Sequence, residues 1–433
     1  MSKYVLVLLM VLLCSSMSFA QTPKELAEMW EKEHISKYFP SDVRHKDLLI
    51  YLDDLRKLGL KVDEVGRSNA ERSIYQVEFG RGPLKIFMWS QMHGDEPTAT
   101  SALVDMLSYF QKHRQEDWVK KIEETVTIRA VPMLNPDGAE AYQRRNLQGI
   151  DVNRDAADLR TPEARLLKKL RDDWSPAIGF NLHNQQALTT VGRTPKQAAI
   201  SLLVVFGDEA KTVNEGQARN QRVAAAMATA LQQLIPGHIG RYDDEWAPTA
   251  FGDNFSAWGT PVILIETGAL HGRDEMFLVK MNFVAFVTAI QSIVTGSEKT
   301  QDPAAYISLP SNGSGGIVNY LFRRANIIDH GDRTVGDIAV IAERRRASFV
   351  VSAKISAVGA LGTLHGLDEY DASGFNVYQR FGKVRPGELG EFYFYKTDRV
   401  VDWNSSDLVF KFPPDAIFSA GRFIKGAELI PKK

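Results

Sequence analysis

Between residues 73 and 295 the sequence alternates short apolar runs with longer helical ones, and this alternation constrains the fold most. The short runs are rich in β-branched residues and almost continuously apolar, as expected of strands buried on both faces. Strands separated by helices indicate an α/β sheet that helices cover on both sides. The predicted strands are Ser73–Phe79, Leu84–Ser90, Val126–Leu134, Ile178–His183, Ser201–Phe206 and Pro261–Glu266; the predicted helical runs are 22–60, 98–113, 161–173, 213–235 and 275–295.

A second unit is expected after the α/β region, because 433 residues exceed one ordinary domain. Composition shifts to Gly, Ser and Pro around residues 298–314, which is typical of a linker. Residues 315–433 are predicted to form a smaller, β-rich accessory domain, which leaves 21–297 as the main domain. The β-like runs beyond the linker are Ile317–Phe322, Asp337–Ala342, Ser348–Ile355, Phe392–Lys396 and Leu408–Phe412.

Residues 1–20 are predicted to be a secretory signal peptide. Lys3 provides a positive start, an apolar run from Tyr4 to Leu13 follows, and Ser18-Phe19-Ala20 is a small-x-small cleavage signal. The mature chain is expected to begin at Gln21, to be secreted or periplasmic, and to have no membrane span. Cys14, the only cysteine, lies in the removed segment, although it leaves lipid attachment there as an alternative. A mature chain without thiols excludes cysteine as nucleophile or ligand.

The net charge of −1 and the 44% hydrophobic content are those of a soluble globular protein with no reason to bind nucleic acid. Against this background, the stretch Gln91–Pro97, which contains His93-Gly-Asp-Glu96, follows a predicted strand, and Pro97 lies in the first turn of the next helix. Imidazole nitrogen and carboxylate oxygen are both zinc ligands, so this pair is a candidate metal site that needs a third ligand. His183 and Glu266 also lie where predicted strands end. Because sites in such sheets form at the carboxyl ends of strands, we expect one shared site.

Downstream, the sequence reads Asn135-Pro-Asp-Gly, and then Arg144, Arg145 and the run Gly149-Ile-Asp151-Val-Asn153-Arg154. Together with His93-x-x-Glu96, His183 and Glu266, this order of motifs resembles the zinc metallocarboxypeptidases of the carboxypeptidase A type. The resemblance covers about residues 22–297 and leaves the last domain outside it. It implies a carboxypeptidase-like fold, with a mixed, mostly parallel sheet flanked by helices.

The same resemblance assigns a role to each matched residue. His93, Glu96 and His183 are the implied ligands of one zinc ion per chain. Glu266 is the implied general base beside the metal. Zinc of this kind activates a water molecule and polarises the scissile carbonyl.

The remaining implied roles concern the substrate and the support of the site. Arg144 matches the arginine that stabilises the developing oxyanion, whereas Arg145 is expected to be solvated. Asn153 and Arg154 match the pair that holds the free terminal carboxylate, a task that suits the planar guanidinium. Asp151 matches the carboxylate that orients a ligand histidine, here His93.

Two assignments stay open. Tyr242 is the candidate for the substrate-clamping tyrosine, but Trp246 competes with it. The pocket is expected from residues 238–256, where Asp243, Asp244, Glu245 and Asp253 indicate either a preference for a basic side chain or a solvated acidic loop. His271 follows Glu266 closely enough to be considered for the site.

The sequence therefore predicts a zinc-dependent exopeptidase, a metallocarboxypeptidase that removes the C-terminal residue from peptides with a free carboxylate. The predicted export adds cell-wall peptides to the candidate substrates. One alternative is a zinc-dependent deacylase of N-acyl amino acids. Another is a non-catalytic protein that binds peptide or glycan on a peptidase fold. The sequence gives no indication of the oligomeric state.

Overall fold

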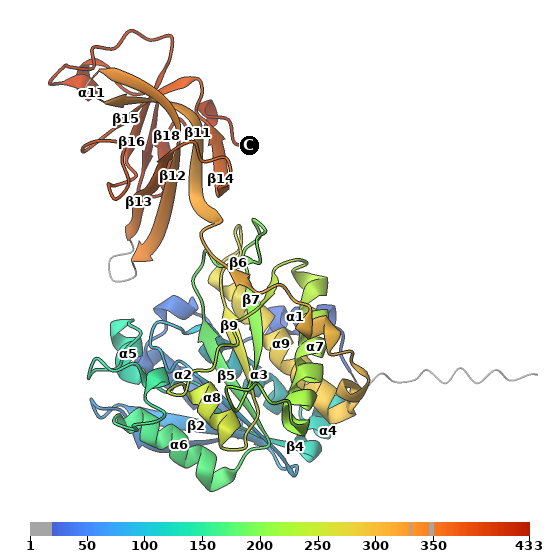
Figure 1. Ribbon diagram of the computed structural model, residues 1–433. Helices are drawn as coiled ribbons and strands as arrows, with labels where there is room; N and C mark the ends of the chain where they lie inside the picture. Colours follow the sequence, from blue (N-terminus) through green and yellow to red (C-terminus); the bar gives the residue numbers. More distant parts are fainter. Residues whose placement is uncertain (1–19, 330, 346–349) are drawn as a thin grey trace, which may run out of the picture.

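The structure is a computed structural model that describes residues 20–329, 331–345 and 350–433. The predicted signal peptide, residues 1–20, lies outside the described residues except for Ala20, as does the start of the predicted strand Ser348–Ile355. Figure 1 shows an α/β body, which holds the first large sheet, and a β-rich module, which holds the second and contains the C-terminus.

The α/β body is built on an eight-stranded sheet in the order β1-β2-β4-β3-β5-β9-β7-β8. The central neighbours β4, β3, β5 and β9 run parallel, while β1, β2 and the β7–β9 pair add antiparallel contacts. The predicted mixed, mostly parallel sheet is thus confirmed. The strands are β1 Lys61–Arg67, β2 Ser73–Gly80, β3 Leu84–Ser90, β4 Val126–Val131, β5 Ile178–Asn184, β7 Ile200–Val205, β8 Ile239–Arg241 and β9 Val262–Thr267.

Strand β3 shows why the central strands are apolar at nearly every position. Ile86 and Met88 face one hydrophobic core, while Phe87 and Trp89 face the other. Because successive side chains of a strand point to opposite faces, a strand covered on both sides must be apolar throughout.

Helices cover both faces of this sheet. Those that contribute to the larger core are α1 Pro23–Glu33, α2 His45–Lys57, α3 Thr98–Lys112, α4 Asp117–Thr125, α7 Glu215–Leu234 and α9 Glu275–Thr295. The smaller core packs against α6 Pro162–Trp174 and α8 Phe251–Ala257. Helix α9 is long and apolar enough to cross a membrane, but 78% of its apolar window is buried, as in a core helix.

The β-rich module holds a second eight-stranded sheet, mostly antiparallel, in the order β13-β12-β11-β15-β16-β17-β18, with β14 paired to β11. Aromatic side chains, led by Phe322, Phe392 and Phe394, fill its separate core. Its strands are β11 Ile317–Asp329, β12 Asp332–Arg345, β13 Val350–Gly359, β14 His365–Asp371, β15 Phe375–Gln379, β16 Phe392–Lys396, β17 Ala416–Ser419 and β18 Arg422–Lys425.

One predicted strand of the module is wrong. Leu408–Phe412 was expected to be a strand, but Leu408–Lys411 forms the short helix α11. Only Leu408 of this helix is buried, and Phe410 is 89% exposed. A short apolar run carries no periodicity that separates a strand from a helical turn, so its propensity alone misled the prediction.

The segment expected to be a linker, residues 298–314, has local structure of its own. It contains most of the 3-10 turn η3 Ser297–Thr300, helix α10 Ala304–Ile307 and the short strand β10 Asn312–Gly313, which pairs with β6 Thr190–Val191. Tyr306 is buried, and its hydroxyl oxygen accepts a hydrogen bond from the Val204 backbone N–H at 2.8 Å. The segment therefore lies against the α/β body.

Candidate active site

Three buried side chains, His93, Glu96 and His183, converge at the carboxyl ends of β3 and β5. One carboxylate oxygen of Glu96 lies 2.8 Å from His93 Nδ1, and the other lies 2.7 Å from His183 Nδ1. One ligand atom from each residue lies within 4.8 Å of the others. Within the described ranges, this is the only group of three or more His, Cys, Asp or Glu residues so arranged.

The loop after β3 brings His93 and Glu96 together through unusual backbone geometry. Gln91 has a left-handed φ of 52°, and its side-chain amide donates to the Gly94 carbonyl oxygen at 2.9 Å. A Cβ at Gly94 would lie 1.9 Å from the Gly138 carbonyl carbon. Only glycine permits this approach, so the loop is held tightly against the segment that follows β4.

Two residues from the Arg144–Arg154 region support the three side chains. Asp151 Oδ1 lies 2.9 Å from His93 Nε2, the ring nitrogen that faces away from Glu96. Arg144 donates from Nε to Asp151 Oδ2 at 2.9 Å and from Nη1 to Glu96 Oε1 at 3.1 Å. A carboxylate on the outer nitrogen fixes the orientation of a ligand imidazole.

The electrostatics of the cluster keep its carboxylates ionised. Burial alone would raise the pKa of Glu96, but the imidazoles of His93 and His183 outweigh it and hold this pKa well below its usual value. Burial likewise opposes ionisation of Asp151, but its hydrogen bond with His93 and the charges of His93 and Arg144 lower its pKa. Ionised oxygen is the form that binds a cation.

The donor set fits a divalent metal ion. Two imidazole nitrogens and one carboxylate are the ligands that zinc takes in sites with a further open position. The three donors are close, buried and backed by Asp151, so the chain's own residues meet the requirements of such a site.

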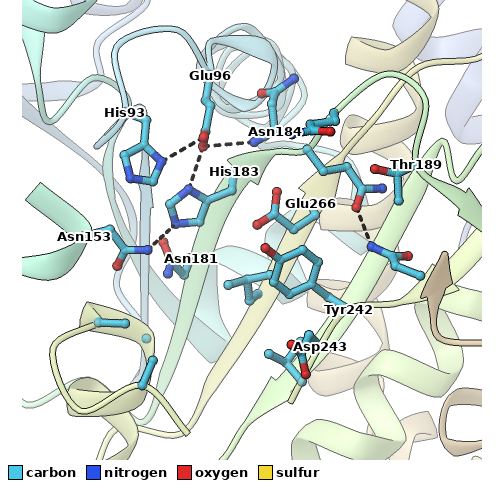
Figure 2. A pocket seen from close by; sticks show the side chains of 18 of the residues that line it. His93, Glu96, Asn153, Asn181, His183, Asn184, Thr189, Tyr242, Asp243 and Glu266 are labelled. Atoms are coloured by element: carbon cyan, nitrogen blue, oxygen red, sulfur yellow. Dashed lines mark hydrogen bonds and ion pairs between the residues drawn. The ribbon is translucent and has the colours of Figure 1, made fainter. Parts of the chain in front are cut away.

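Glu266 lies beside this cluster because β9 pairs with β5 in register, with His183 opposite Glu266. The carboxylate is 6% exposed, and its Oε2 is buried without a hydrogen-bond partner. Burial and the nearby charge of Glu96 raise the pKa of Glu266 well above its usual value, and the Arg144 guanidinium opposes this shift. Figure 2 shows Glu266 facing the cavity next to His183.

The remaining predicted residues line the same cavity of about 1050 Å³. Asn153 is buried, with its side-chain nitrogen 3.5 Å from His183 Nε2, while Arg154 donates from Nη1 to the Asn153 carbonyl oxygen at 3.0 Å. Tyr242 lies close to Glu266 (Figure 2). Burial raises the pKa of the Tyr242 hydroxyl to about 12, and the charges of Glu266 and Glu96 add to this effect. Trp246 also lines the cavity.

The acidic residues of the 238–256 stretch separate into two groups. Asp243, Glu245 and Asp253 line the cavity, whereas Asp244 is absent from the lining and pairs with Lys211 at 2.6 Å. Burial raises the pKa of Asp253 to about 6, although the Ala247 backbone N–H and the Arg154 charge oppose the shift.

Sequence reasoning missed Asn181. It lies two residues before His183 on β5, so both side chains point to the same face of the sheet. It is 1% exposed, it lines the cavity, and neither its Oδ1 nor its Nδ2 has a partner. The sequence signal was a polar residue at an inward position of an apolar strand.

The structure leaves His271 out of the cavity lining and adds Asn312 to it. His271 does not line the cavity; its Nε2 lies 3.3 Å from Asp368 of the β-rich module. Asn312, in the expected linker, does line it. No local pattern marks Asn312, because it reaches the cavity only through long-range pairing.

Residues 50–235 match the model of the zinc carboxypeptidase family. Probable carboxypeptidase 2 of Trichophyton verrucosum is 29% identical over 197 residues, which are 45% of this chain and 36% of that protein. The chain thus spans about a third of the length of the first curated relatives it matches. Carboxypeptidase SOL1 of Arabidopsis thaliana is 31% identical over 93 residues, 19% of each chain.

Among solved structures, a metallo-carboxypeptidase from Burkholderia cenocepacia is 16% identical, with a TM-score of 0.47, over 58% of this chain and 69% of that one. A metallo-carboxypeptidase from Pseudomonas aeruginosa, in complex with (2-guanidinoethylmercapto)succinic acid, is 17% identical. Its TM-score is 0.45, and the match covers 57% of this chain and 68% of that one.

Proposed function

We propose that the protein is a zinc-dependent metallocarboxypeptidase that hydrolyses the C-terminal bond of peptides, in keeping with the match of residues 50–235 to the zinc carboxypeptidase family. The observation that carries this proposal is the position of Glu266, in register with His183 and with a buried, unpartnered carboxylate oxygen beside the metal-type cluster. A buried carboxylate with only a structural role would be expected to have a hydrogen-bond or ion-pair partner, because an unpaired buried charge is costly.

His93, Glu96 and His183 would hold one zinc ion. When bound, zinc supplies Lewis acidity, which lowers the pKa of a water molecule and polarises the scissile carbonyl. Asp151 keeps the His93 ring oriented through its outer nitrogen.

Glu266 is proposed to accept a proton from the attacking water at its free Oε2 and to deliver it to the leaving nitrogen. The raised pKa of this carboxyl supports the role, because a general base works best when its pKa approaches the working pH. Its neighbour Tyr242, with a pKa of about 12, stays a neutral phenol and can donate a hydrogen bond.

The two arginines that line the cavity are proposed to interact with negative charge on the substrate. The Arg144 guanidinium is held by Asp151 and Glu96, so its position is set before negative charge develops on the carbonyl oxygen. Asn153 and Arg154, with Tyr242, are proposed to bind the terminal carboxylate. Arginine suits this role because its fork meets a carboxylate in a bidentate way.

The side chain of the released residue is proposed to be polar or basic. Asp243, Glu245 and Asp253 line the cavity, and Asn181 offers a buried donor and acceptor without partners. These groups favour a ligand that brings hydrogen-bond donors, because it would satisfy atoms that an apolar side chain would leave unpaired.

Export of the protein is a further proposal, supported by the signal-peptide pattern of residues 1–20. It would expose the enzyme to extracellular or periplasmic peptides, including cell-wall peptides.

The deciding test is Glu266→Gln in the zinc-loaded protein. We expect turnover of an N-blocked dipeptide to fall by roughly 10²–10⁴-fold, since a general base is lost while the shape is kept. Zinc content, measured by metal analysis, should stay unchanged. Unchanged turnover would refute the role of Glu266, and ligand binding without turnover in the unaltered protein would favour a binding protein.

The same assay separates peptidase from deacylase. The apoprotein and the zinc-restored protein are each given the N-blocked dipeptide and an N-acyl amino acid. A carboxypeptidase should recover activity on the dipeptide. Recovery on the N-acyl amino acid alone would replace the proposed reaction with deacylation.

A further inference from the structure

We propose that the segment Asn312–Ser314, which leads into the β-rich module, forms one wall of the substrate cleft and contacts the part of a peptide upstream of the cleaved bond. Within this wall, Asn312 is a positioning residue that fixes Gln185 and Ser201 beside the site. The inference rests on the proposed carboxypeptidase function and extends it to the length of the substrate. Residues 312–314 lie beyond the part of the chain that matches the zinc carboxypeptidase family, residues 50–235.

The backbone of this segment is tied to the α/β body at successive residues. The Pro310 carbonyl oxygen accepts from the Arg241 N–H, and the Ser311 carbonyl oxygen accepts from the Gly192 N–H, each at 2.9 Å. Strand β10 then pairs antiparallel with β6, with Asn312 opposite Val191. The wall is therefore part of a small sheet.

The fit between the two strands is close. A Cβ at Gly313 would lie 2.2 Å from the Gly192 carbonyl oxygen, so only glycine allows the strands to approach this far. Because the contact depends on the backbone, the wall has a defined position relative to the site.

The Asn312 side chain closes a ring of three polar side chains. Its Nδ2 donates to Gln185 Oε1 at 2.6 Å, and its Oδ1 accepts from Ser201 Oγ at 2.7 Å. Gln185 Nε2 donates to Ser201 Oγ at 3.0 Å, so each member has two partners within the ring. Replacing Asn312 would leave groups of the other two members unpaired.

This ring lies beside the candidate catalytic residues, and Gln185 and Asn312 line the same cavity. Ser201 is the register partner of Glu266 in the β7–β9 pair. Gln185 follows His183 by two residues, and its N–H donates to the carbonyl oxygen of Thr267, the residue after Glu266, at 2.8 Å. Asn312 thus connects the segment before the β-rich module to Gln185, which directly follows β5, and to Ser201 of β7, and each of these partners is paired in turn with β9, where the proposed base resides.

The wall lies on the Thr189 side of the cavity, because Thr190, the next residue, pairs with Gly313. Figure 2 shows Asn153 on one side and Thr189 on the other, with Glu266 between them. Asn312–Ser314 line the cavity together with Thr189. A peptide held at Asn153 by its carboxylate and cleaved beside Glu266 must extend toward this wall.

The space continues past the wall. A second cavity of about 570 Å³ shares Asn312, Gly313 and Ser314 with the first and is lined further by Arg193 and Thr194. Its lining includes four glycines, which leave backbone groups uncovered by side chains, and this suits the peptide backbone of an extended ligand. The cleft therefore has room for residues upstream of the cleaved bond, and we expect peptides longer than a dipeptide to bind better.

The test uses the full chain and two substrates with the same terminal residue, an N-blocked dipeptide and a hexapeptide. Ser314 is exposed, so Ser314→Trp narrows the cleft without disturbing a core. We expect it to raise KM for the hexapeptide about tenfold and to raise KM for the dipeptide much less. Asn312→Ala should lower kcat/KM for the hexapeptide more than for the dipeptide. The exposed Asn404→Ala, in the module, is the matched control and should change neither.

Thermal unfolding of each variant completes the design. Equal losses on both substrates for Asn312→Ala, together with a lowered unfolding temperature, would show a purely structural role and overturn its assignment as a positioning residue. Unchanged hexapeptide kinetics in Ser314→Trp would show that residues 312–314 do not contact the substrate. Failure of the unaltered protein to cleave either peptide would overturn the proposed function and this inference with it, whereas dipeptide cleavage without any effect of length overturns the inference alone.

Discussion

The α/β body and the β-rich module use their inward-facing polar side chains differently. In the body, His183 and Glu266 face a cavity, and Glu266 keeps an oxygen without a partner. In the module, the largely buried Arg323 donates to Asp337 and Glu369 and to two backbone carbonyl oxygens. Polar groups in the body are available to a ligand, whereas those around Arg323 are occupied by one another.

The difference follows from strand direction. In the body, β3, β5 and β9 are parallel neighbours, so their carboxyl ends meet at one edge of the sheet. In the module most neighbours are antiparallel, so the carboxyl ends alternate between opposite edges. A parallel arrangement therefore concentrates the functional groups that follow strands. The module's expected contribution is stability, whereas the segment before it shapes the cleft through β10.

The largest effect should come from the body, with Arg144→Ala. Loss of the guanidinium removes the proposed stabilisation of the oxyanion, so kcat should fall about 10²–10³-fold. The adjacent Arg145 is exposed and its side chain donates to the Gly149 carbonyl oxygen, which makes Arg145→Ala the matched control. Steady-state kinetics on the dipeptide would check this. Equal effects of the two substitutions would contradict the assignment of Arg144.

The next effect should come from the module and appear in stability alone. Arg323 is 14% exposed, and Arg323→Ala leaves Asp337 and Glu369 without their cation, which should lower the free energy of unfolding by about 2–4 kcal/mol. Urea unfolding measures this change, while kcat on the dipeptide should stay the same.

Arg324→Ala is the control for that experiment, because Arg324 is mostly exposed where it pairs with Asp371. Its loss should have a much smaller effect on unfolding. A large drop in kcat for Arg323→Ala would show that the module and the body are coupled more strongly than the comparison implies.

The smallest effect concerns pH and Asp253. With a pKa of about 6, this carboxyl is neutral at pH 5 and ionised at pH 7.5, so its charge appears as pH rises. If it faces the substrate side chain, kcat/KM for a peptide ending in Lys, divided by that for one ending in Leu, should rise about three- to tenfold over this interval. The ratio cancels the titration of groups that act on both peptides.

Asp253→Asn should flatten this profile, whereas Asp244→Asn, which removes a carboxylate that is absent from the cavity lining, should preserve it. The raised pKa also has a cost for the folded protein. The neutral form is favoured on folding, so its contribution to stability is present below the ordinary pKa of 3.8 and is lost as pH rises through about 6. If the Lys-to-Leu ratio of kcat/KM does not change with pH in the unaltered protein, Asp253 does not contact the substrate side chain.

Much of the body could be predicted because its signals are local. The strand β3 and the helix α9 have the predicted bounds, since long buried elements carry continuous or periodic apolar patterns. Residues at the strand ends, such as His183 and Glu266, could be found because the sheet type places carboxyl ends together. The failure at Leu408–Phe412 shows the limit, since five residues without a decisive period do not distinguish a strand from a helical turn.

Other features could not be predicted because they depend on register and on contacts between distant segments. Asn181 was missed because a lone Asn in an apolar strand reveals nothing about whether its partners are present. The placement of Tyr242 close to Glu266 depends on how β8 and the loop after it pack. The domain boundaries proposed at residues 298–314 remain a prediction, because the same segment contributes β10 to the small sheet with β6.

By itself, the sequence determined the alternation of strands and helices and the identity of the side chains that follow each strand, because both depend only on residues that are neighbours in the chain. Only the tertiary structure decided that His183 stands opposite Glu266, that Asp151 backs His93, and that Asn312 closes the ring with Gln185. The physical reason is that a hydrogen bond or a strand register is a relation between segments far apart in the chain, which packing alone brings to within a few ångströms.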